Sequence, residues 1–314
     1  MNCAYDVSVI VPCLNEEGNI EKLFAALHSE FQQMGYTCEY IFVDDGSTDG
    51  TLELLRGLSK NNVHVRYLSF SRNFGHQSAL LAGMEAASGR ACIMMDADLQ
   101  HPVSLLPRML ELWNAGYKVV NTSRIDGRST GWLKRYSSKL FYRFLNFLSD
   151  YPLPPGSADF RLLDRRVVDA VLTCAGDMQF LRGLIAWCGF RQTSLSYVPE
   201  SRYAGKTNYS PRRMISLALS GITSFSIRPL RLGIFLSGIF ALLSLSEIIY
   251  VFYVSLFTDR TVSGWASLAI LISVLGTVVL LLLGIIGEYV GRCFMQGKQR
   301  PSYLVAEYGG GDEQ

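Results

Sequence analysis

The chain has 314 residues, of which 49% are hydrophobic and 18% are charged, and its formal net charge at pH 7 is +2. This near balance of charge gives no basis for nucleic acid as a partner and excludes the strongly basic class of binding proteins. The length allows one large or two ordinary domains, and the apolar residues are concentrated in the C-terminal quarter.

The first two thirds of the chain alternate strand-like and helix-like segments. Apolar runs predict strands over 7–14, 39–45, 65–70 and 91–96, and amphipathic patterns predict helices over 18–34, 48–59 and 77–87. This order is typical of an α/β domain whose mostly parallel sheet is covered by helices. We expect that domain to occupy residues 1–209.

Polar motifs follow three of these predicted strands. They read PCLNEE (12–17), DDGSTDGT (44–51) and DADLQ (96–100). In open parallel sheets, ligands bind beyond the carboxyl ends of the strands. The shared position of the motifs therefore predicts one site at this edge of the sheet. The alternative for the second motif is a plain strand-to-helix turn, because Asp, Gly, Ser and Thr are the common turn and capping residues.

The third motif places two carboxylates, Asp96 and Asp98, at a strand end. Side chains two residues apart in an extended segment point to the same side, so the two carboxylates would repel each other. Mg²⁺ or Mn²⁺ is commonly held by one or two carboxylates together with phosphate oxygens. The pair is therefore a candidate site for such a metal and a nucleotide diphosphate, with His101 beside it. The alternative is a solvated surface loop.

Two long apolar stretches, 232–257 and 265–286, lie within residues 230–288. Each is long enough to span a bilayer as a helix. Only seven residues, TDRTVSG, join them, so they predict a transmembrane hairpin. Arginines and lysines flank its outer ends, which by the positive-inside rule places residues 1–209 and the tail 289–314 in the cytoplasm.

Two further segments have the pattern of helices that lie in the bilayer surface. Residues 132–148 carry apolar side chains at helical spacing among lysines and arginines, and residues 210–229 precede the first span. For 132–148 the alternative is that the apolar stripe packs on the sheet as ordinary core. If both segments lie in the interface, they would bring the α/β domain down to the membrane.

The chain resembles the family 2 glycosyltransferases with a GT-A, Rossmann-like fold, and among them the polyprenyl-phosphate glycosyltransferases. That group includes the bacterial bactoprenol glucosyltransferases and the dolichol-phosphate-mannose synthases. The motifs that carry the resemblance are VIVPCLNEEGNI, VDDGSTDGT, SFSRNFGHQSALLAGMEAASG, MDADLQHP, SADFRLLDRRVVD, RYAGKTNYS, GITSFSIRPLR and GIIGEYVGR. They run through nearly the whole chain.

The resemblance implies roles for individual residues. It assigns the nucleotide to Pro12, Glu17, Asp44, Asp45 and Arg72. It assigns Mg²⁺ or Mn²⁺ and the donor diphosphate to Asp96, Asp98 and Gln100. Phosphate contacts fall to Arg124 and Arg202, and Asp159 is the acidic residue near the acceptor. In RYAGKTNYS, Asn208 stands where many relatives have a lysine, and Lys206 lies two residues earlier as a candidate replacement.

The resemblance implies a multi-pass enzyme of the bacterial inner membrane with its catalytic domain in the cytoplasm. It would transfer a hexose, with inversion, from a nucleotide sugar to a polyprenyl phosphate such as undecaprenyl phosphate. UDP-glucose is the preferred donor, because SADFRLLDRRVVD and GITSFS are most similar to the bactoprenol glucosyltransferases. A second copy of the chain, a flippase and a downstream glycosyltransferase are candidate partners.

Other readings remain open at this point. The same reaction could use GDP-mannose or a modified UDP-pentose, and a protein of a different class, a non-catalytic membrane scaffold, could retain the fold. A lipid phosphate has a second pKa near 6, so it is already mostly a dianion at neutral pH. We therefore predict that Asp159 positions the acceptor or the sugar, with general-base catalysis as the competing role.

Overall fold

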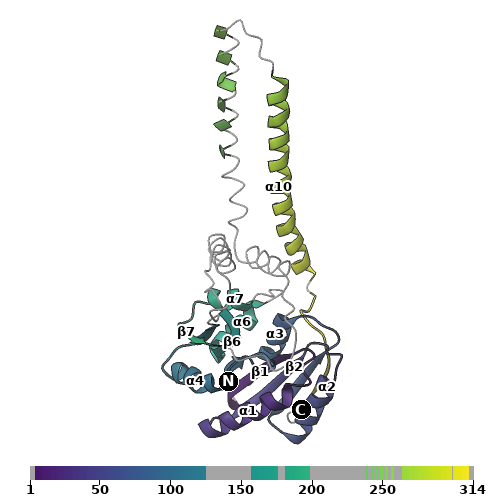
Figure 1. The fold of residues 1–314 in the computed structure, drawn as a ribbon, viewed down its shortest axis with the longest axis vertical. Helices are drawn as coiled ribbons and strands as arrows, with labels where there is room; N and C mark the ends of the chain where they lie inside the picture. Colours follow the sequence, from purple (N-terminus) through teal and green to yellow (C-terminus); the bar gives the residue numbers. More distant parts are fainter. Residues whose placement is uncertain are drawn as a thin grey trace.

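The computed structural model describes residues 4–124, 157–175, 181–198, 264–298 and 300–310, together with isolated helical positions between 238 and 257. The first three ranges fold into an α/β domain, and most of the fourth forms one long helix beside it (Figure 1). The segments 132–148 and 210–229 and the loop 258–263 lie outside the described residues.

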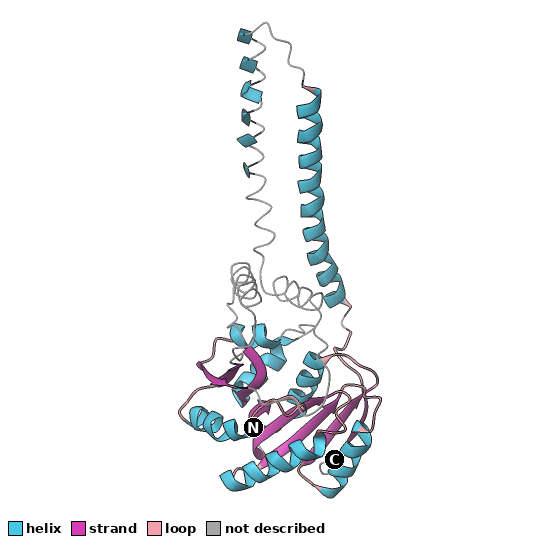
Figure 2. Ribbon diagram, viewed as in Figure 1, coloured by secondary structure: helices cyan, strands magenta, loops and turns pink. Residues whose placement is uncertain are grey.

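A sheet of eight strands forms the centre of the domain, in the order β7-β5-β6-β4-β1-β2-β3-β8 (Figure 2). The strands are β1 (Tyr5–Cys13), β2 (Cys38–Asp44), β3 (Val65–Phe70), β4 (Gly89–Met94), β5 (Val119–Arg124), β6 (Ser157–Asp164), β7 (Gln192–Tyr197) and β8 (Val305–Gly309). Four of the neighbouring pairs are parallel and three are antiparallel. The predicted α/β domain with a mostly parallel sheet is confirmed.

Helices cover both faces of this sheet. They are α1 (Ile20–Met34), α2 (Thr51–Asn61), α3 (His76–Ala86), a short 3-10 turn η1 (Val103–Leu105), α4 (Leu106–Asn114), α6 (Arg165–Ala175) and α7 (Leu181–Trp187). One core lies between the sheet and α1, α2 and α4, and the other lies between the sheet and α3, α6 and α7. The period of two within β1 produces this division, since Val7, Val9 and Val11 face the first core and Ile10 faces the second.

The antiparallel strand β6 brings its first residues to the carboxyl ends of the parallel strands. Arg161 lies opposite Met94, the last residue of β4, so Asp159 extends past the end of that strand. The strand β4 ends two residues earlier than predicted, and the following turn carries Leu99 with a positive φ of 60°. Asp96 and Asp98 therefore lie in a turn, where the alternation rule for strands does not apply.

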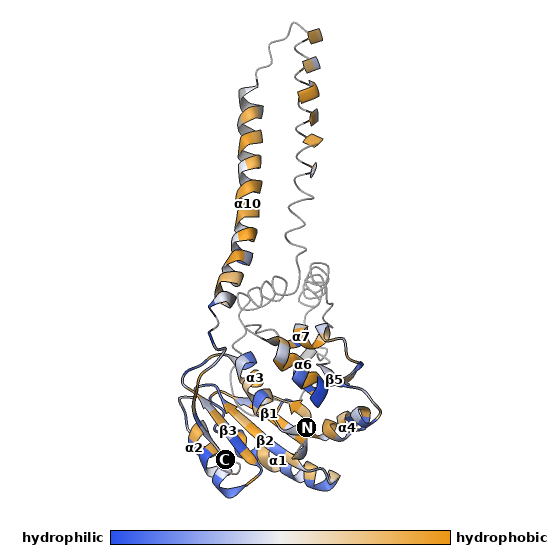
Figure 3. Ribbon diagram, turned by 180° about the vertical axis from the view of Figure 1, so that it is seen from behind, coloured by the Kyte–Doolittle hydropathy of each residue, from blue (hydrophilic) through white to orange (hydrophobic). Residues whose placement is uncertain are grey.

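The helix α10 (Trp265–Gly297) extends away from the domain. Its 33 residues span about 50 Å, and the segment Val274–Met295 has a mean hydropathy of 2.1 with none of it buried. Figure 3 shows that hydrophobic residues, coloured orange, run along most of its length. In the described part of the chain this helix alone is long and apolar enough to cross a membrane. The first predicted span, 232–257, is described only at isolated positions, so the hairpin stays a prediction.

After α10 the chain returns to the sheet, which the sequence did not predict. The strand β8 pairs antiparallel with β3 at the edge of the sheet, so the first and last described strands, β1 and β8, belong to the same sheet (Figure 1). Glu307 accepts hydrogen bonds from Arg56 (Nε, 2.8 Å) and from the Tyr67 hydroxyl (2.6 Å). The ring of Tyr303 stacks on Phe70 with 4.9 Å between centroids. The tail thus covers the outer side of β3, whose backbone groups would otherwise lie at the edge of the sheet, and β8 becomes the edge strand.

Candidate functional site

The loops after β1 and β2 hold each other in place. The Asn15 side chain accepts the Thr48 backbone N–H at 2.8 Å, and the Asn15 N–H donates to the Ser47 hydroxyl at 2.9 Å. Asn15 has a positive φ of 56°, which is uncommon outside glycine. The carboxylate of Glu17 accepts the Gly50 N–H at 2.8 Å, and Pro12 is buried in β1. The described contacts of Glu17 therefore join the two loops.

The carboxylates of Asp44 and Asp45 are buried at the end of β2. Asp44 accepts the Ser47 N–H at 3.0 Å and the Ser69 hydroxyl at 2.7 Å. Asp45 accepts the N–H groups of Phe74 (2.6 Å) and Gly75 (3.0 Å). Burial raises the pKa of Asp45, although these two N–H groups act in the opposite direction. Both residues thus fix the backbone around the predicted nucleotide site.

The loop after β3 places the backbone of Arg72 beside Gly46, where an added Cβ would lie 2.6 Å from the Arg72 carbonyl carbon. The guanidinium of Arg72 lies over the Phe74 ring at 4.0 Å from its centroid, and the side chain is exposed. Ser71 of this loop donates its N–H to the carbonyl of Leu304, at 3.0 Å. The returning tail therefore contacts the loop that carries Arg72.

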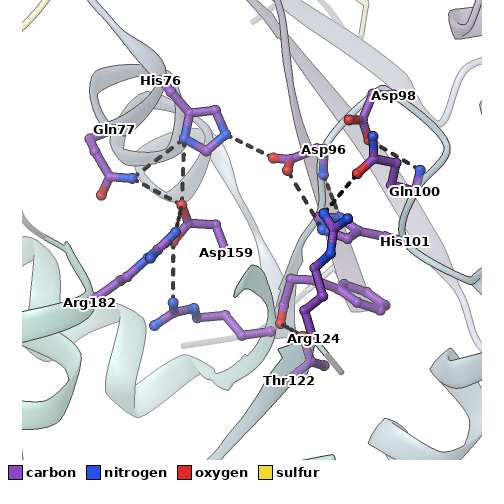
Figure 4. Close-up of polar contacts among 12 residues, drawn as sticks. His76, Gln77, Asp96, Asp98, Gln100, His101, Thr122, Arg124, Asp159 and Arg182 are labelled. Atoms are coloured by element: carbon purple, nitrogen blue, oxygen red, sulfur yellow. Dashed lines mark hydrogen bonds and ion pairs between the residues drawn. The ribbon is translucent and has the colours of Figure 1, made fainter. Parts of the chain in front are cut away.

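The acidic turn after β4 is held by two histidines (Figure 4). His76 Nε2 lies 2.9 Å from Asp96 Oδ1, and His101 Nδ1 accepts the Asp96 N–H at 3.0 Å. Burial would raise the pKa of Asp96, but the hydrogen bond and charge of His76 outweigh it and lower the pKa. The ring of His101 stacks on Phe160 with 4.9 Å between centroids. Asp96 is nevertheless 38% exposed and accessible to a ligand.

Asp98, Gln100 and Arg124 form the other side of this turn. The Gln100 N–H donates to Asp98 Oδ1 at 3.1 Å, and Arg124 Nη1 donates to Gln100 Oε1 at 3.2 Å. Arg124 is the last residue of β5 and is exposed. The predicted phosphate contact is thus adjacent to the predicted metal site.

Asp159 lies on the far side of His76 from this turn, where His76 Nδ1 is 3.8 Å from Asp159 Oδ2 (Figure 4). Arg182 donates to both of its oxygens, from Nε at 2.7 Å and from Nη2 at 2.8 Å. Arg161 Nη2 lies 3.2 Å from Oδ1, and Gln77 Nε2 lies 3.3 Å from Oδ2. Burial would raise the pKa of Asp159, but Arg182 and then Arg161 outweigh burial and hold that pKa far below its usual range.

Comparison with known proteins identifies the family. The model described as glycosyl transferase family 2 matches residues 8–172. The chain belongs to glycosyltransferase family 2. This confirms the family predicted from the motifs, and the α/β domain is its GT-A fold. The protein is therefore a glycosyltransferase.

The glycosyltransferase has relatives along nearly its whole length. It is 41% identical to glycosyltransferase YkcC of Bacillus subtilis, over 95% of this chain and 92% of that protein. It is 36% identical to a bactoprenol glucosyl transferase of Shigella phage SfV, over 95% and 97% of the two chains. A solved mannosyltransferase of Pyrobaculum calidifontis, in complex with GDP-Man and Mn²⁺, is 21% identical with a TM-score of 0.48, over 70% and 63%. Family membership rests on the sequence matches and not on this distant likeness.

The acidic turn of this glycosyltransferase has the donor set that suits a hard divalent cation. Asp96 and Asp98 offer carboxylate oxygens, and Mg²⁺ needs only one or two of these when substrate phosphates and waters complete its shell. Among the described residues, no group of three or more His, Cys, Asp or Glu side chains could hold a metal by itself. The residues therefore fit a metal whose coordination shell is completed by a phosphate ligand.

Two predicted site residues of the glycosyltransferase, Arg202 and Lys206, lie outside the described residues, as does Asn208. The structure brings the other predicted residues to the same edge of the sheet, at the ends of β1, β2, β4 and β5 and the start of β6, and places Arg72 in the loop after β3.

Four residues of this site were not predicted from the sequence: His76, Gln77, Arg161 and Arg182. The segment SRNFGHQ follows β3 just as the three recognised motifs follow their strands, so the strand-end rule could have found His76 and Gln77. Arg182 lies in α7, and no sequence motif around it indicates a functional role. Only the three-dimensional contacts identify it.

Proposed function

We propose that this glycosyltransferase transfers glucose, with inversion, from UDP-glucose to a polyprenyl phosphate in the bacterial inner membrane. The observation that carries the proposal is the end-to-end similarity, at 36% identity, to a bactoprenol glucosyl transferase. The arrangement of the site supports it, because acidic and basic side chains lie on two sides of His76 at one edge of the sheet (Figure 4). The apolar helix α10, joined to the same domain, supports a membrane substrate.

On the donor side, Asp96 and Asp98 would hold Mg²⁺ or Mn²⁺, with Gln100 bonded to Asp98 beside them. Such a metal acts as a Lewis acid that stabilises the charge on a departing nucleoside diphosphate. Arg124 lies next to Gln100, and its planar fork suits the oxygens of the same diphosphate. The loops of Glu17, Asp44, Asp45 and Arg72 would bind the nucleotide.

On the acceptor side, an oxygen of the lipid phosphate forms the new bond to the anomeric carbon. The bond from that carbon to the diphosphate breaks, and the diphosphate leaves with the electron pair. A phosphate monoester is mostly a dianion at neutral pH, so this step needs no proton acceptor. The strongly lowered pKa of Asp159 argues against its use as a base. We therefore assign Asp159 a positioning role.

The membrane arrangement that we propose has two spans, with the α/β domain and the tail in the cytoplasm. The basic residues that flank the predicted spans support this orientation. The return of the chain from α10 to β8 supports a tail on the same side as the domain. Segments 132–148 and 210–229 would lie in the interface and bring the site close to the lipid phosphate.

Incubation of the purified protein with Mn²⁺ or Mg²⁺, undecaprenyl phosphate and a panel of labelled nucleotide sugars tests the proposal. We expect labelled lipid with UDP-glucose, and none after EDTA treatment. Asp98→Asn is the matched inactive variant, since it keeps the shape of the side chain and removes one carboxylate. Its folding is checked by thermal unfolding against the unchanged protein.

The outcomes separate the alternatives. Labelled lipid with GDP-mannose or a UDP-pentose in place of UDP-glucose would correct the donor and keep the reaction. Nucleotide binding without labelled lipid from any donor would refute the transferase proposal and support a scaffold.

A further inference from the structure

The segment that follows α10 contacts the loop after β3 before it forms β8. Tyr303 lies six positions after Gly297, the last residue of α10 (303 − 297), and two positions before β8 (Figure 1). The carbonyl of Leu304 accepts the N–H of Ser71, the first residue after β3, at 3.0 Å. The chain that leaves the apolar helix is therefore bonded directly to the loop that carries Arg72.

Aromatic rings continue this contact into the loop. The ring of Tyr303 stacks on the buried Phe70, with 4.9 Å between centroids and 18° between the ring planes. Phe70 in turn packs edge-on against Phe74, with 5.7 Å between centroids. The guanidinium of Arg72 lies over the Phe74 ring. A continuous set of ring contacts thus leads from the tail to an arginine of the predicted nucleotide site.

Tyr303 also contacts the helix that follows this loop. Its hydroxyl donates a hydrogen bond to the carboxylate of Glu85, in the last turn of α3. The ring is therefore held both at its face, by Phe70, and at its hydroxyl. Tyr303 thus contacts the end of β3 and the helix α3, which are the elements on the two sides of the loop 71–75.

The end of β2 confines the other side of the loop. Asp45 accepts the N–H groups of Phe74 and Gly75, and a Cβ added to Gly46 would lie 2.6 Å from the Arg72 carbonyl carbon. The strands β2 and β8 flank β3 on its two sides. The loop after β3 is consequently held between the turn after β2 and the tail, and loss of the tail contact would leave one side unsupported.

We propose that Tyr303 and Leu304 are positioning residues of the donor site, which hold the loop 71–75 in the form that binds the nucleotide. This inference rests on the proposed role of Asp45 and Arg72 in nucleotide binding. A loop that is already ordered loses less conformational entropy on binding than one that the ligand must fix. The tail contact therefore increases the affinity for the nucleotide, and the segment after the apolar helix becomes part of the support of the donor site.

Calorimetry of UDP binding to the whole chain in detergent micelles, with Mn²⁺ present, measures this effect. For Tyr303→Ala we expect the Kd for UDP to rise roughly 3- to 10-fold, the range that one aromatic pair supplies. Tyr303→Phe keeps the stacked ring, so its Kd should stay within about twofold of that of the unchanged protein. The donor KM should rise with the Kd while kcat and the acceptor KM stay unchanged, because a mere loss of folded protein would lower kcat and leave KM as it is.

Tyr308→Ala is the matched control, because Tyr308 is a tyrosine of the same returning segment whose side chain is 81% exposed. It should change neither the Kd for UDP nor either KM. If Tyr303→Ala does not fold, Tyr303→Leu takes its place, since leucine keeps an apolar side chain beside Phe70 and removes the stacked ring. It should raise the Kd for UDP by at least about threefold.

The outcomes separate this inference from the proposed function. If the unchanged protein does not bind UDP, the proposed donor is wrong, and this inference is wrong with it. If the unchanged protein binds UDP, but a folded Tyr303→Ala or Tyr303→Leu protein raises the Kd by less than about threefold, the transferase stands and the positioning role of the tail is refuted. An equal rise for Tyr308→Ala would also refute it, because the effect would then come from general destabilisation of β8.

Discussion

Replacing Asp159 with asparagine distinguishes an anchor for two arginines from a general base. The change keeps the size of the side chain and removes the charge that Arg182 and Arg161 share. Breaking one side of a buried ion pair costs about 3–5 kcal/mol. Arg182 is partly exposed and can turn toward water, but Arg161 cannot, so we expect the lower end, about 3 kcal/mol. For a domain of this size, that lowers the Tm by about 6–12 °C.

Thermal unfolding of the detergent-solubilised protein, followed by tryptophan fluorescence, measures this difference. Asp169→Asn is the control, since its pair with Arg165 is more exposed and its loss should cost less than about 1 kcal/mol. The lowered pKa of Asp159 means that its stabilising effect is complete above the unfolded value of about 4 and is lost below it. The Tm difference should therefore stay constant from pH 5.5 to about 8 and shrink near pH 3–4.

An Asp159→Asn protein with the Tm of the unchanged enzyme and almost no turnover would refute this reasoning. It would show that the carboxylate acts in the chemical step. If the positioning role is right, the variant keeps some turnover, and the pH profile of that turnover matches that of the unchanged enzyme.

Three further changes test other parts of the site. Asp98→Asn should weaken Mn²⁺ binding by roughly tenfold or more, measured by calorimetry with UDP present, because one of two carboxylate ligands is lost. Gly75→Ala should raise both donor and acceptor KM values, because Gly75 has φ 101° and ψ 152°, a region that costs other residues about 1–3 kcal/mol. Gly310→Ala should speed the exchange of backbone amide hydrogens in β3 and β8. Gly310 has φ +78°, and a Cβ added there would lie 2.1 Å from the Val65 carbonyl oxygen. Unchanged exchange would show that β8 does not protect the amides of β3.

The elements of the first hundred residues were predictable because their hydrophobic periods are local. The four predicted strands and three predicted helices agree with β1–β4 and α1–α3 to within three residues at each end. The motifs at the strand ends were predictable for the same reason, since each follows its strand directly. The geometry of Asp96 and Asp98 was not, because the period of two holds only inside a strand and β4 ends at Met94.

The contacts that needed the structure are those between distant parts of the chain. Arg182 and Gln77 lie on two different helices and 105 positions apart in the sequence (182 − 77), yet both contact Asp159. The strand β8 has only five residues, and its partner β3 precedes it by more than 230 residues. A five-residue strand at an edge has no periodic pattern long enough to distinguish it from a loop. Its pairing with β3 and its ion pair with Arg56 exist only after the chain has returned from α10.

The start of α3 explains how the two substrates can be aligned by one element. Gly75 gives its N–H to Asp45 in the predicted nucleotide site, His76 contacts Asp96, and Gln77 contacts Asp159. Three consecutive residues thus contact the three carboxylates that define the site, so a displacement of this turn would move all of them together. A joint change in the donor and acceptor KM values of Gly75→Ala would be explained by this arrangement, whereas independent donor and acceptor sites would not link the two values.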